Sequence, residues 1–353
     1  MVSEMRIINI LTAAAILIAA GCATVPDHQK KMIFMDRETV EDLSDEQIVV
    51  NDIKMKDIKK RHKNKIAILL DMTDQTEGRL KLRDSAKFMT AMQNFARTEL
   101  GKVKAYNLAY VDASTFNSAL KTGDAVNGVQ YEFLCRMNIS LTAEEINGYD
   151  TDIGNYICRL QWELIDNRTK INGLGDLELP SVKETLICQD AQKRKLAIIG
   201  FSGRRMGGDS DKVAQEAFNV ATLHCLFQFN AQLANRVPFG AMVGDMKILD
   251  GNLDLNIKGG VEIGITKNMQ MLISNEDLDS IAVGTVMRAG DGKSRVRVWR
   301  WLSPTWKKQM LAAAGSKEKA EEFLDGEDTA LYAVSLGMPR PPKDVLIDAG
   351  VKR

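Results

Sequence analysis

The clearest pattern in the chain is an alternation of apolar and mostly polar residues over two runs, 129–142 and 155–164. A period of two places the apolar residues of each run on one face of a strand. A loop containing Asn147-Gly148 and Gly154 joins the two runs. The pattern predicts a long antiparallel hairpin with one buried face. Its apolar positions are Val129, Tyr131, Phe133, Cys135, Met137, Ile139 and Leu141 in the first strand, and Tyr156, Cys158, Leu160, Trp162 and Leu164 in the second.

The segments around the hairpin predict the rest of an α/β domain. Lys65 to Asp71 is a short apolar run without a helical period, which is typical of a buried strand. Leu80 to Leu100 has apolar residues at three- and four-residue steps and predicts an amphipathic helix. A long helix, apolar on several sides, is expected to end near Asn235. With further strands at 104–111 and 181–188, these elements predict an α/β (α+β) fold with a mixed sheet flanked by helices.

From Phe239 to about Leu302 the pattern changes to short strands separated by glycine turns. About five such strands predict a small all-β barrel or sandwich domain. Ser303-Pro304 is a favourable helix start, because proline fits the first helical position. Two short helices and a proline-rich tail are expected to end the chain.

The beginning of the chain has the features of a lipoprotein signal peptide. Met5-Arg6 precedes an apolar run from Ile7 to Ala20, and Gly21-Cys22 follows. A cysteine after small residues predicts cleavage before Cys22 and attachment of lipid to its thiol. The apolar run is shorter than the ~20 residues that a transmembrane helix needs. We take Met5 as the expected start, since it removes an acidic residue from the basic end of the signal.

Lipidation at Cys22 predicts the location of the protein. Acyl chains hold a chain at a membrane without a spanning helix. Ala23 follows the cysteine, where aspartate would resemble an inner-membrane retention signal. The expected location is therefore the periplasmic side of a cell outer membrane. The predicted parts are a signal peptide (1–21), a polar tether (22–63), an α/β domain (64–236), a small β domain (237–302) and a helical, proline-rich tail (303–353).

Composition and charge fit a folded body that acts without nucleic acid. Hydrophobic residues make up 45% of the chain and charged residues 27%, both near globular averages. Lys+Arg and Asp+Glu are equal at 47, whereas a nucleic-acid-binding surface is usually basic. The sequence therefore gives no electrostatic reason to expect a nucleic-acid partner.

Four cysteines follow Cys22, namely Cys135, Cys158, Cys188 and Cys225. Their wide spacing contains no C-x-x-C, which makes zinc or thioredoxin-like chemistry unexpected. An exported protein can form disulfides. Cys135 and Cys158 are a candidate disulfide, because they could face each other across the hairpin. The alternative is that all four are buried free thiols, which are common in protein cores.

The sequence offers only weak evidence for catalytic residues. Ser202 lies in Gly200-Phe201-Ser202-Gly203, which is similar to a nucleophile elbow, but Arg204 stands where that motif needs glycine. The three histidines show no paired metal-ligand spacing. His224 lies in the apolar helix and is expected to be a hydrogen-bonded core residue. We assign no catalytic residue, metal or cofactor, and an envelope hydrolase is only the second alternative function.

Three tryptophans, Trp299, Trp301 and Trp306, lie close together late in the chain. Such residues can anchor an interface with a partner. Trp299 and Trp301 share one face of a predicted strand, however, and this favours a place in the core of the β domain.

The order of these elements resembles a family of exported lipoproteins of the CsgG/LpoB-like type. The resemblance covers residues 64–302, from the first strand through the hairpin, whose second strand ends in Leu164-Ile165-Asp166. The turn after it departs from the D-x-x-T-G pattern of the family, because Thr169 is followed by lysine. The segment after Pro238 resembles a FlgT-like small β domain, with Asn256-x-x-Gly259-Gly260-Val261-x-x-Gly264 in its N-x-G-x-x-x-G turn region.

The resemblance implies a non-catalytic, membrane-tethered protein that works through a protein partner in the cell envelope or through self-association. We therefore expect an adaptor or assembly factor for an envelope machine in secretion, surface-appendage or wall synthesis. The first alternative is a subunit of an oligomeric, curli-type secretion channel, because alternating strands also build transmembrane pores. The same hairpin is needed to complete the sheet, and no second pair of such strands is visible, so a folded domain is favoured over a pore.

Overall fold

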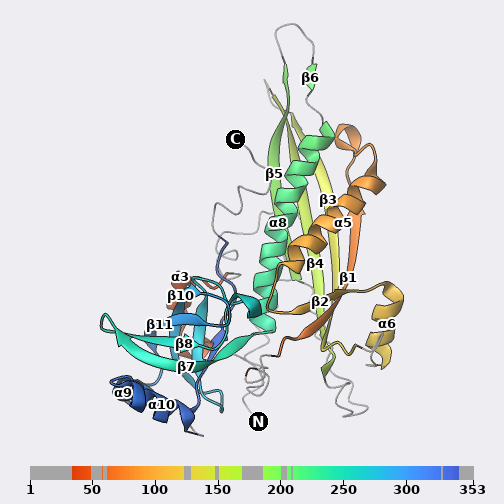
Figure 1. Ribbon diagram of the computed structural model, residues 1–353. Coiled ribbons are helices and arrows are strands. Elements are labelled where there is room, and N and C mark those ends of the chain that lie inside the picture. The colour runs from red at the N-terminus through yellow and green to blue at the C-terminus, as the bar shows by residue number, and fades with distance from the viewer. Residues whose placement is uncertain are drawn as a thin grey trace, which may run out of the picture.

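Two sheets organise the chain in this computed structural model: an open six-stranded sheet and a closed barrel (Figure 1). The structure describes residues 34–48, 58, 62–122, 129–147, 151–168, 186–199, 205–207, 210–326 and 329–341. The signal peptide, Cys22 and the serine motif around Ser202 lie outside the described residues. The mixed sheet flanked by helices and the following β barrel confirm the predicted fold class at this level.

The open sheet has the strand order β2-β1-β3-β4-β5-β6. Its strands are β1 (Lys65–Asp74), β2 (Asn107–Tyr110), β3 (Phe133–Asn147), β4 (Thr151–Asp166), β5 (Leu186–Ile199) and β6 (Arg205–Gly207). Strand β1 pairs in parallel with both β2 and β3. From β3 onward every pairing is antiparallel, which makes the sheet mixed.

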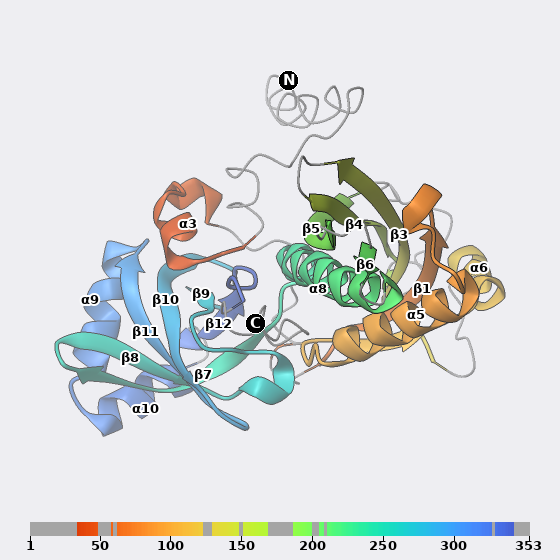
Figure 2. The ribbon, with the colours of Figure 1, turned by 90° about the horizontal axis from the view of Figure 1, so that it is seen from above.

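Helices α5 (Ser85–Gly101) and α8 (Ser210–Arg236) cover one face of this sheet (Figures 1 and 2). The hairpin buries its predicted apolar face beneath them, because every second residue of β3 and β4 points to that side. Trp162 packs edge-on against Phe229 of α8, with ring centroids 4.9 Å apart. The long helix is therefore the cover of the hairpin. Among the described residues, none of the helices has both the length and the apolar character needed to cross a membrane.

The start of the predicted hairpin is different in the structure. Strand β3 begins at Phe133, and Tyr131 packs in a smaller cluster on the opposite side of the sheet. Helix α6 (Ala113–Thr122) covers that side and places Phe116 against Leu134. Val129 and Tyr131 continue the alternation in sequence, but they precede the strand and do not share its face.

The second sheet closes into a barrel with the order β10-β11-β8-β7-β12-β9. Its strands are β7 (Gly240–Leu249), β8 (Asn252–Ile257), β9 (Gln270–Ser274), β10 (Ser280–Ala289), β11 (Ser294–Trp301) and β12 (Tyr332–Ser335). The short helix η3 (Val261–Ile263) follows β8, and α9 (Pro304–Ala313) and α10 (Lys317–Asp325) precede β12. The expected end of the β domain at residue 302 is wrong, because β12 lies between β7 and β9 and closes the barrel.

Residues 34–48, which we call the N-terminal belt, pack on the outside of the barrel (Figure 2). The belt contains α3 (Arg37–Glu41) and η1 (Asp45–Gln47). Val40 and Ile48 are both 0% exposed and contact Leu272 and Val283 of the barrel. The prediction of a polar tether over residues 22–63 is therefore wrong for this part, because apolar residues of the belt complete a buried cluster.

Arg300 of β11 holds the belt in place. Its guanidinium donates hydrogen bonds to Val40 O (3.0 Å) and Leu43 O (2.9 Å), and it forms an ion pair with Asp45 at 2.6 Å. We expect Arg300→Ala to make the belt more sensitive to limited proteolysis and to lower its local stability by about 2 kcal/mol, because charged hydrogen bonds contribute about 1.5–3 kcal/mol. Arg288→Ala is the matched control, since this exposed arginine of β10 forms no hydrogen bond or ion pair with the described belt residues. Equal cleavage of the two variants would contradict the role of Arg300.

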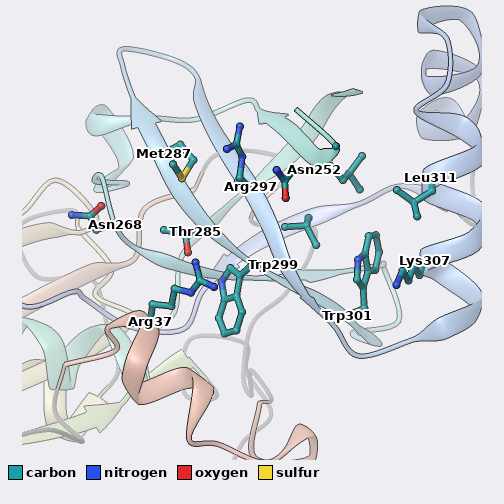
Figure 3. A pocket seen from close by; sticks show the side chains of 13 residues that line it. Arg37, Asn252, Asn268, Thr285, Met287, Arg297, Trp299, Trp301, Lys307 and Leu311 are labelled. Carbon is teal, nitrogen blue, oxygen red and sulfur yellow. The ribbon is translucent and has the colours of Figure 1, made fainter. Parts of the chain in front are cut away.

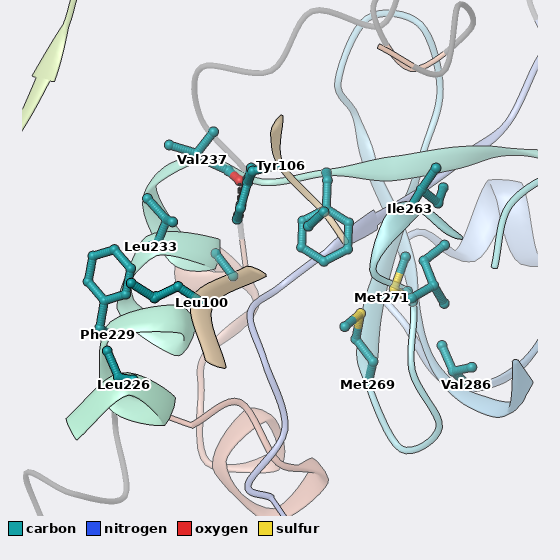
Figure 4. Close-up of a cluster of buried hydrophobic side chains, with 14 of the residues drawn as sticks. Leu100, Tyr106, Leu226, Phe229, Leu233, Val237, Ile263, Met269, Met271 and Val286 are labelled. Carbon is teal, nitrogen blue, oxygen red and sulfur yellow. Dashed lines mark hydrogen bonds between the residues drawn. The ribbon is translucent and has the colours of Figure 1, made fainter. Parts of the chain in front are cut away.

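A buried junction joins the α/β domain to the barrel (Figure 4). The Tyr106 hydroxyl donates a hydrogen bond of 2.7 Å to Val237 O at the end of α8, and its ring meets Phe239 edge-on. Gly264 has a φ of +85° and lies directly against Ala105. Apolar side chains on both sides of the junction belong to one continuous core cluster.

Candidate functional site

A hollow of about 700 Å³ opens on the outer face of the barrel, beside α9 (Figure 3). Trp299 and Trp301 come to it from β11, Lys307 and Leu311 from α9, and Arg37 from the N-terminal belt. Segments far apart in the sequence therefore build one concave surface that combines aromatic, cationic and amide groups. Surfaces of this composition are suited to binding a partner.

Strand alternation places the two tryptophans on the outside. Val296 and Val298 are buried inside the barrel, so the residues between and beyond them point outward. Trp299 and Trp301 are half-buried, and neither lies in the barrel interior. The interpretation of the pair as barrel core is wrong. Their shared parity with Arg295 and Arg297 was the signal that this face of the strand is the polar one.

Trp299 has a fixed orientation. Its indole N–H donates a hydrogen bond to Gln270 Oε1 at 3.0 Å, and the Thr285 hydroxyl donates to the same oxygen at 2.8 Å. The Arg37 guanidinium lies 4.8 Å from the ring centroid, within the range of a cation–π contact. Arg37 also pairs with Glu41 of the same helix at 2.8 Å, so both its neighbours, the indole ring and the carboxylate, orient the guanidinium.

A buried carboxylate positions the arginine at the floor of the hollow. Asp254 is 1% exposed and accepts two hydrogen bonds from Arg297, at 2.8 and 3.1 Å. The hydrogen bond to Asp254 raises the pKa of Arg297, so the guanidinium stays charged. Two-point pairing of this kind fixes the plane of a guanidinium. Lys307, in contrast, is exposed at the rim and forms no ion pair with the described residues.

The structure does not bring together the residues of the candidate disulfide. Cys135 lies opposite Leu164, and Cys158 lies opposite Leu141. Six residues along β3 separate these positions, which is about 20 Å at the rise of a strand. All four described cysteines are buried free thiols, and burial raises the pKa of Cys135 and Cys188. The predicted bridge between Cys135 and Cys158 is therefore wrong.

The other candidate residues of the sequence lie at separate places in the structure. His224 Nδ1 lies 3.1 Å from Asp190 Oδ2, which agrees with a hydrogen-bonded position on α8. Trp306 packs edge-on against Phe323 of α10 and does not line the hollow that contains the other two tryptophans. Within the described parts of the chain, no three His, Cys, Asp or Glu side chains gather as metal ligands.

A second hollow, of about 1050 Å³, lies between the α/β domain and the barrel. Its walls come from α5, α8 and the barrel residues around η3, and Phe34 of the belt borders it. No sequence pattern predicted this hollow, because its walls meet only when the two domains pack together.

Comparisons with known proteins assign no family. No protein-family model and no curated protein matches the chain. Among solved structures, a neuraminyllactose-binding hemagglutinin homolog from Helicobacter pylori is 10% identical, with coverage of 49% of this chain and 84% of that chain and a TM-score of 0.29. Lipoprotein GNA1162 from Neisseria meningitidis is 11% identical over 37% of this chain and 83% of that chain, with a TM-score of 0.20. The PelC dodecamer from Paraburkholderia phytofirmans is 15% identical over 46% and 88%, with a TM-score of 0.21. Scores and identities this low assign neither a family nor a function to the chain.

Proposed function

We propose that the protein is a lipoprotein of the cell envelope that serves as an adaptor or assembly factor, and that it holds a protein partner in the tryptophan hollow of the barrel. The observation that carries this proposal is the pair Trp299 and Trp301, half-buried on the outer face of β11 within one concave surface. Tryptophan and arginine are the residues most enriched where interfaces gain their binding energy.

The way in which the hollow is held supports a preformed docking surface. Gln270 fixes the ring of Trp299 by a hydrogen bond, and Asp254 fixes Arg297. Groups that are ordered before binding lose less conformational entropy when a partner arrives. Lys307 at the rim adds a positive charge, so we propose that the partner presents an apolar side chain flanked by acidic residues.

The envelope location rests on the N-terminal motif. A basic residue, an apolar run and Gly21-Cys22 support lipidation and placement on the periplasmic side of an outer membrane. The mixed sheet with α5 and α8 on one face supports a CsgG/LpoB-like domain, and the barrel supports a FlgT-like one. The cover of α8 over the hairpin favours an adaptor over a channel subunit, because the apolar face that would meet lipid is packed inside the domain.

A photo-crosslinking amino acid placed at two neighbouring positions of α9 tests the proposal. Lys307 lines the hollow, whereas Lys308 is also exposed but does not line it. We expect a discrete adduct with one envelope protein from position 307 and none from position 308. Trp301→Ala should lower the yield of the adduct about tenfold or more, since a central aromatic anchor contributes about 2 kcal/mol or more.

Cys22→Ala provides the second arm of this experiment. Loss of the lipid should move the chain out of the membrane fraction and remove the adduct in cells, while purified components still crosslink. Equal adducts from positions 307 and 308, or an adduct that Trp301→Ala leaves unchanged, would disprove docking at the hollow. A Cys22→Ala chain that stays in the membrane fraction would disprove lipid anchoring alone.

A further inference from the structure

The hollow between the two domains has an apolar wall and belongs to neither sheet. Phe95 and Val103 contribute from the α5 side, Leu226 and Phe227 from α8, and Val261 from η3. Val261 is 40% exposed, which leaves its side chain open to a ligand. The volume of about 1050 Å³ matches the upper range of small-molecule sites, which is about 300–1,000 Å³.

The rim of this hollow carries unneutralised positive charge. Lys104 and Lys267 are both exposed, one from each domain, and neither forms an ion pair with the described residues. The other cations at the rim are already engaged, since Lys102 pairs with Glu99 at 2.7 Å and Arg340 with Asp36 at 3.5 Å. A ligand with a negative group therefore meets two available ammonium groups beside an apolar wall.

The wall also contains a buried polar atom whose hydrogen-bonding capacity is not satisfied by the described residues. Asn230 Oδ1 lies buried in the lining and has no hydrogen-bond partner among the described residues. A buried acceptor without a donor is unfavourable, and a hydroxyl of a bound molecule would supply the missing hydrogen bond.

From these features we propose that the interdomain hollow binds an anionic lipid, with an acyl chain along the apolar wall and the negative headgroup between Lys104 and Lys267. Two helices, a turn and the end segments of the described chain form the lining, so no strand edge is offered to a ligand. A peptide would leave its backbone N–H and C=O groups unpaired against this wall, whereas a hydrocarbon chain has no such groups. The inference does not depend on the adaptor role, which uses the tryptophan-lined hollow; Asn268 borders both hollows, and the substitutions below lie outside the tryptophan hollow.

Binding of cis-parinaric acid, an anionic fatty acid that fluoresces in apolar surroundings, tests the proposal. The protein is the whole mature chain, prepared with its lipid and as the Cys22→Ala variant. We expect saturable binding of the probe by both forms, with displacement by phosphatidylglycerol. Val261→Glu should weaken binding at least tenfold, because it places a like charge on the wall. Ile248→Glu is the matched control, since Ile248 is 47% exposed on the barrel and does not line the hollow.

Lys267→Glu tests the headgroup site separately. It should weaken binding of the acid by about fivefold or more, in line with the contribution of one lysine to an anionic lipid surface. Lys308→Glu, on α9, should leave binding unchanged. All four positions are exposed, so thermal unfolding should confirm that each variant remains folded.

Three outcomes would overturn the inference. The first is equal binding by Val261→Glu and Ile248→Glu. The second is equal affinity for cis-parinaric acid and its neutral methyl ester, which would remove the role of the cationic rim. The third is uptake of the probe by Cys22→Ala only, which would mean that the protein's own acyl chain occupies the hollow instead of a free lipid.

Discussion

Replacing Trp162 by alanine should lower the free energy of unfolding by about 3–5 kcal/mol, the largest loss we expect from a single side chain. Trp162 is 1% exposed and sits between the hairpin and the long helix α8. Its ring packs edge-on against Phe229, and its indole N–H donates a hydrogen bond of 2.8 Å to Gln232 Oε1. The substitution removes a large volume from a closed core and leaves a cavity that the surrounding strands cannot fill. Urea unfolding followed by far-UV circular dichroism measures the change.

Trp162→Phe separates packing from hydrogen bonding. Phenylalanine keeps most of the buried ring but loses the N–H, so we expect a smaller loss of about 1–2 kcal/mol. Gln232 Oε1 retains a second donor in the thiol of Cys188, at 3.2 Å, which limits the effect. If Trp162→Ala unfolds at the same urea concentration as the unmodified protein, α8 does not hold the hairpin in the way described.

Gly264→Ala should loosen the junction between the domains and lower the free energy of unfolding by about 3 kcal/mol or more. Two effects combine at this position. The φ of +85° is strained for any residue with a side chain, and the new Cβ would lie 2.6 Å from Ala105 Cβ and 2.8 Å from Ala105 N. Because Ala105 N belongs to the backbone, relief requires one domain to move away from the other. Small-angle scattering and limited proteolysis at the junction should both report that movement.

Gly251→Ala is the control for backbone strain alone. Gly251 has a φ of +74°, close to that of Gly264, but a Cβ there meets no atom within 4 Å. We expect a loss of only about 1 kcal/mol and no change in the scattering profile. Equal destabilisation by the two alanines would show that the contact with Ala105 contributes nothing, and the junction would then depend on Tyr106 and its neighbours.

The elements with a strong internal period could be predicted from the sequence. The hairpin, α5 and α8 each carry enough apolar residues at regular steps to define a buried face without any knowledge of what covers it. The ends of these elements were less predictable. Tyr131 continues the alternation of β3 but packs on the other side of the sheet, since periodicity does not mark where a strand begins.

The parts that escaped prediction depend on contacts between distant residues. Val40 stands among polar neighbours, and Ile48 begins a run of only three apolar residues, so neither position has a period that predicts its burial against the barrel. Strand β12 has four residues and is stable because β7 and β9 already flank it. The hollow on the barrel combines Arg37 with Trp299, which are brought together by the belt. Parity with the neighbouring arginines could have placed the tryptophans outside, but nothing local pointed to Arg37.

The N-terminal belt also limits the distance between the folded body and a lipid anchor at Cys22. A tether that reached residue 63 would let the folded body drift about 140 Å from an acylated Cys22 when fully extended. The described contacts of the belt with the barrel begin at Met35, which packs against the cluster around Leu272. Thirteen residue steps separate Cys22 from Met35, and a chain of that length spans about 45 Å at most. If Cys22 carries the lipid, the barrel works near the bilayer surface, and a partner must have its binding segment at that same height.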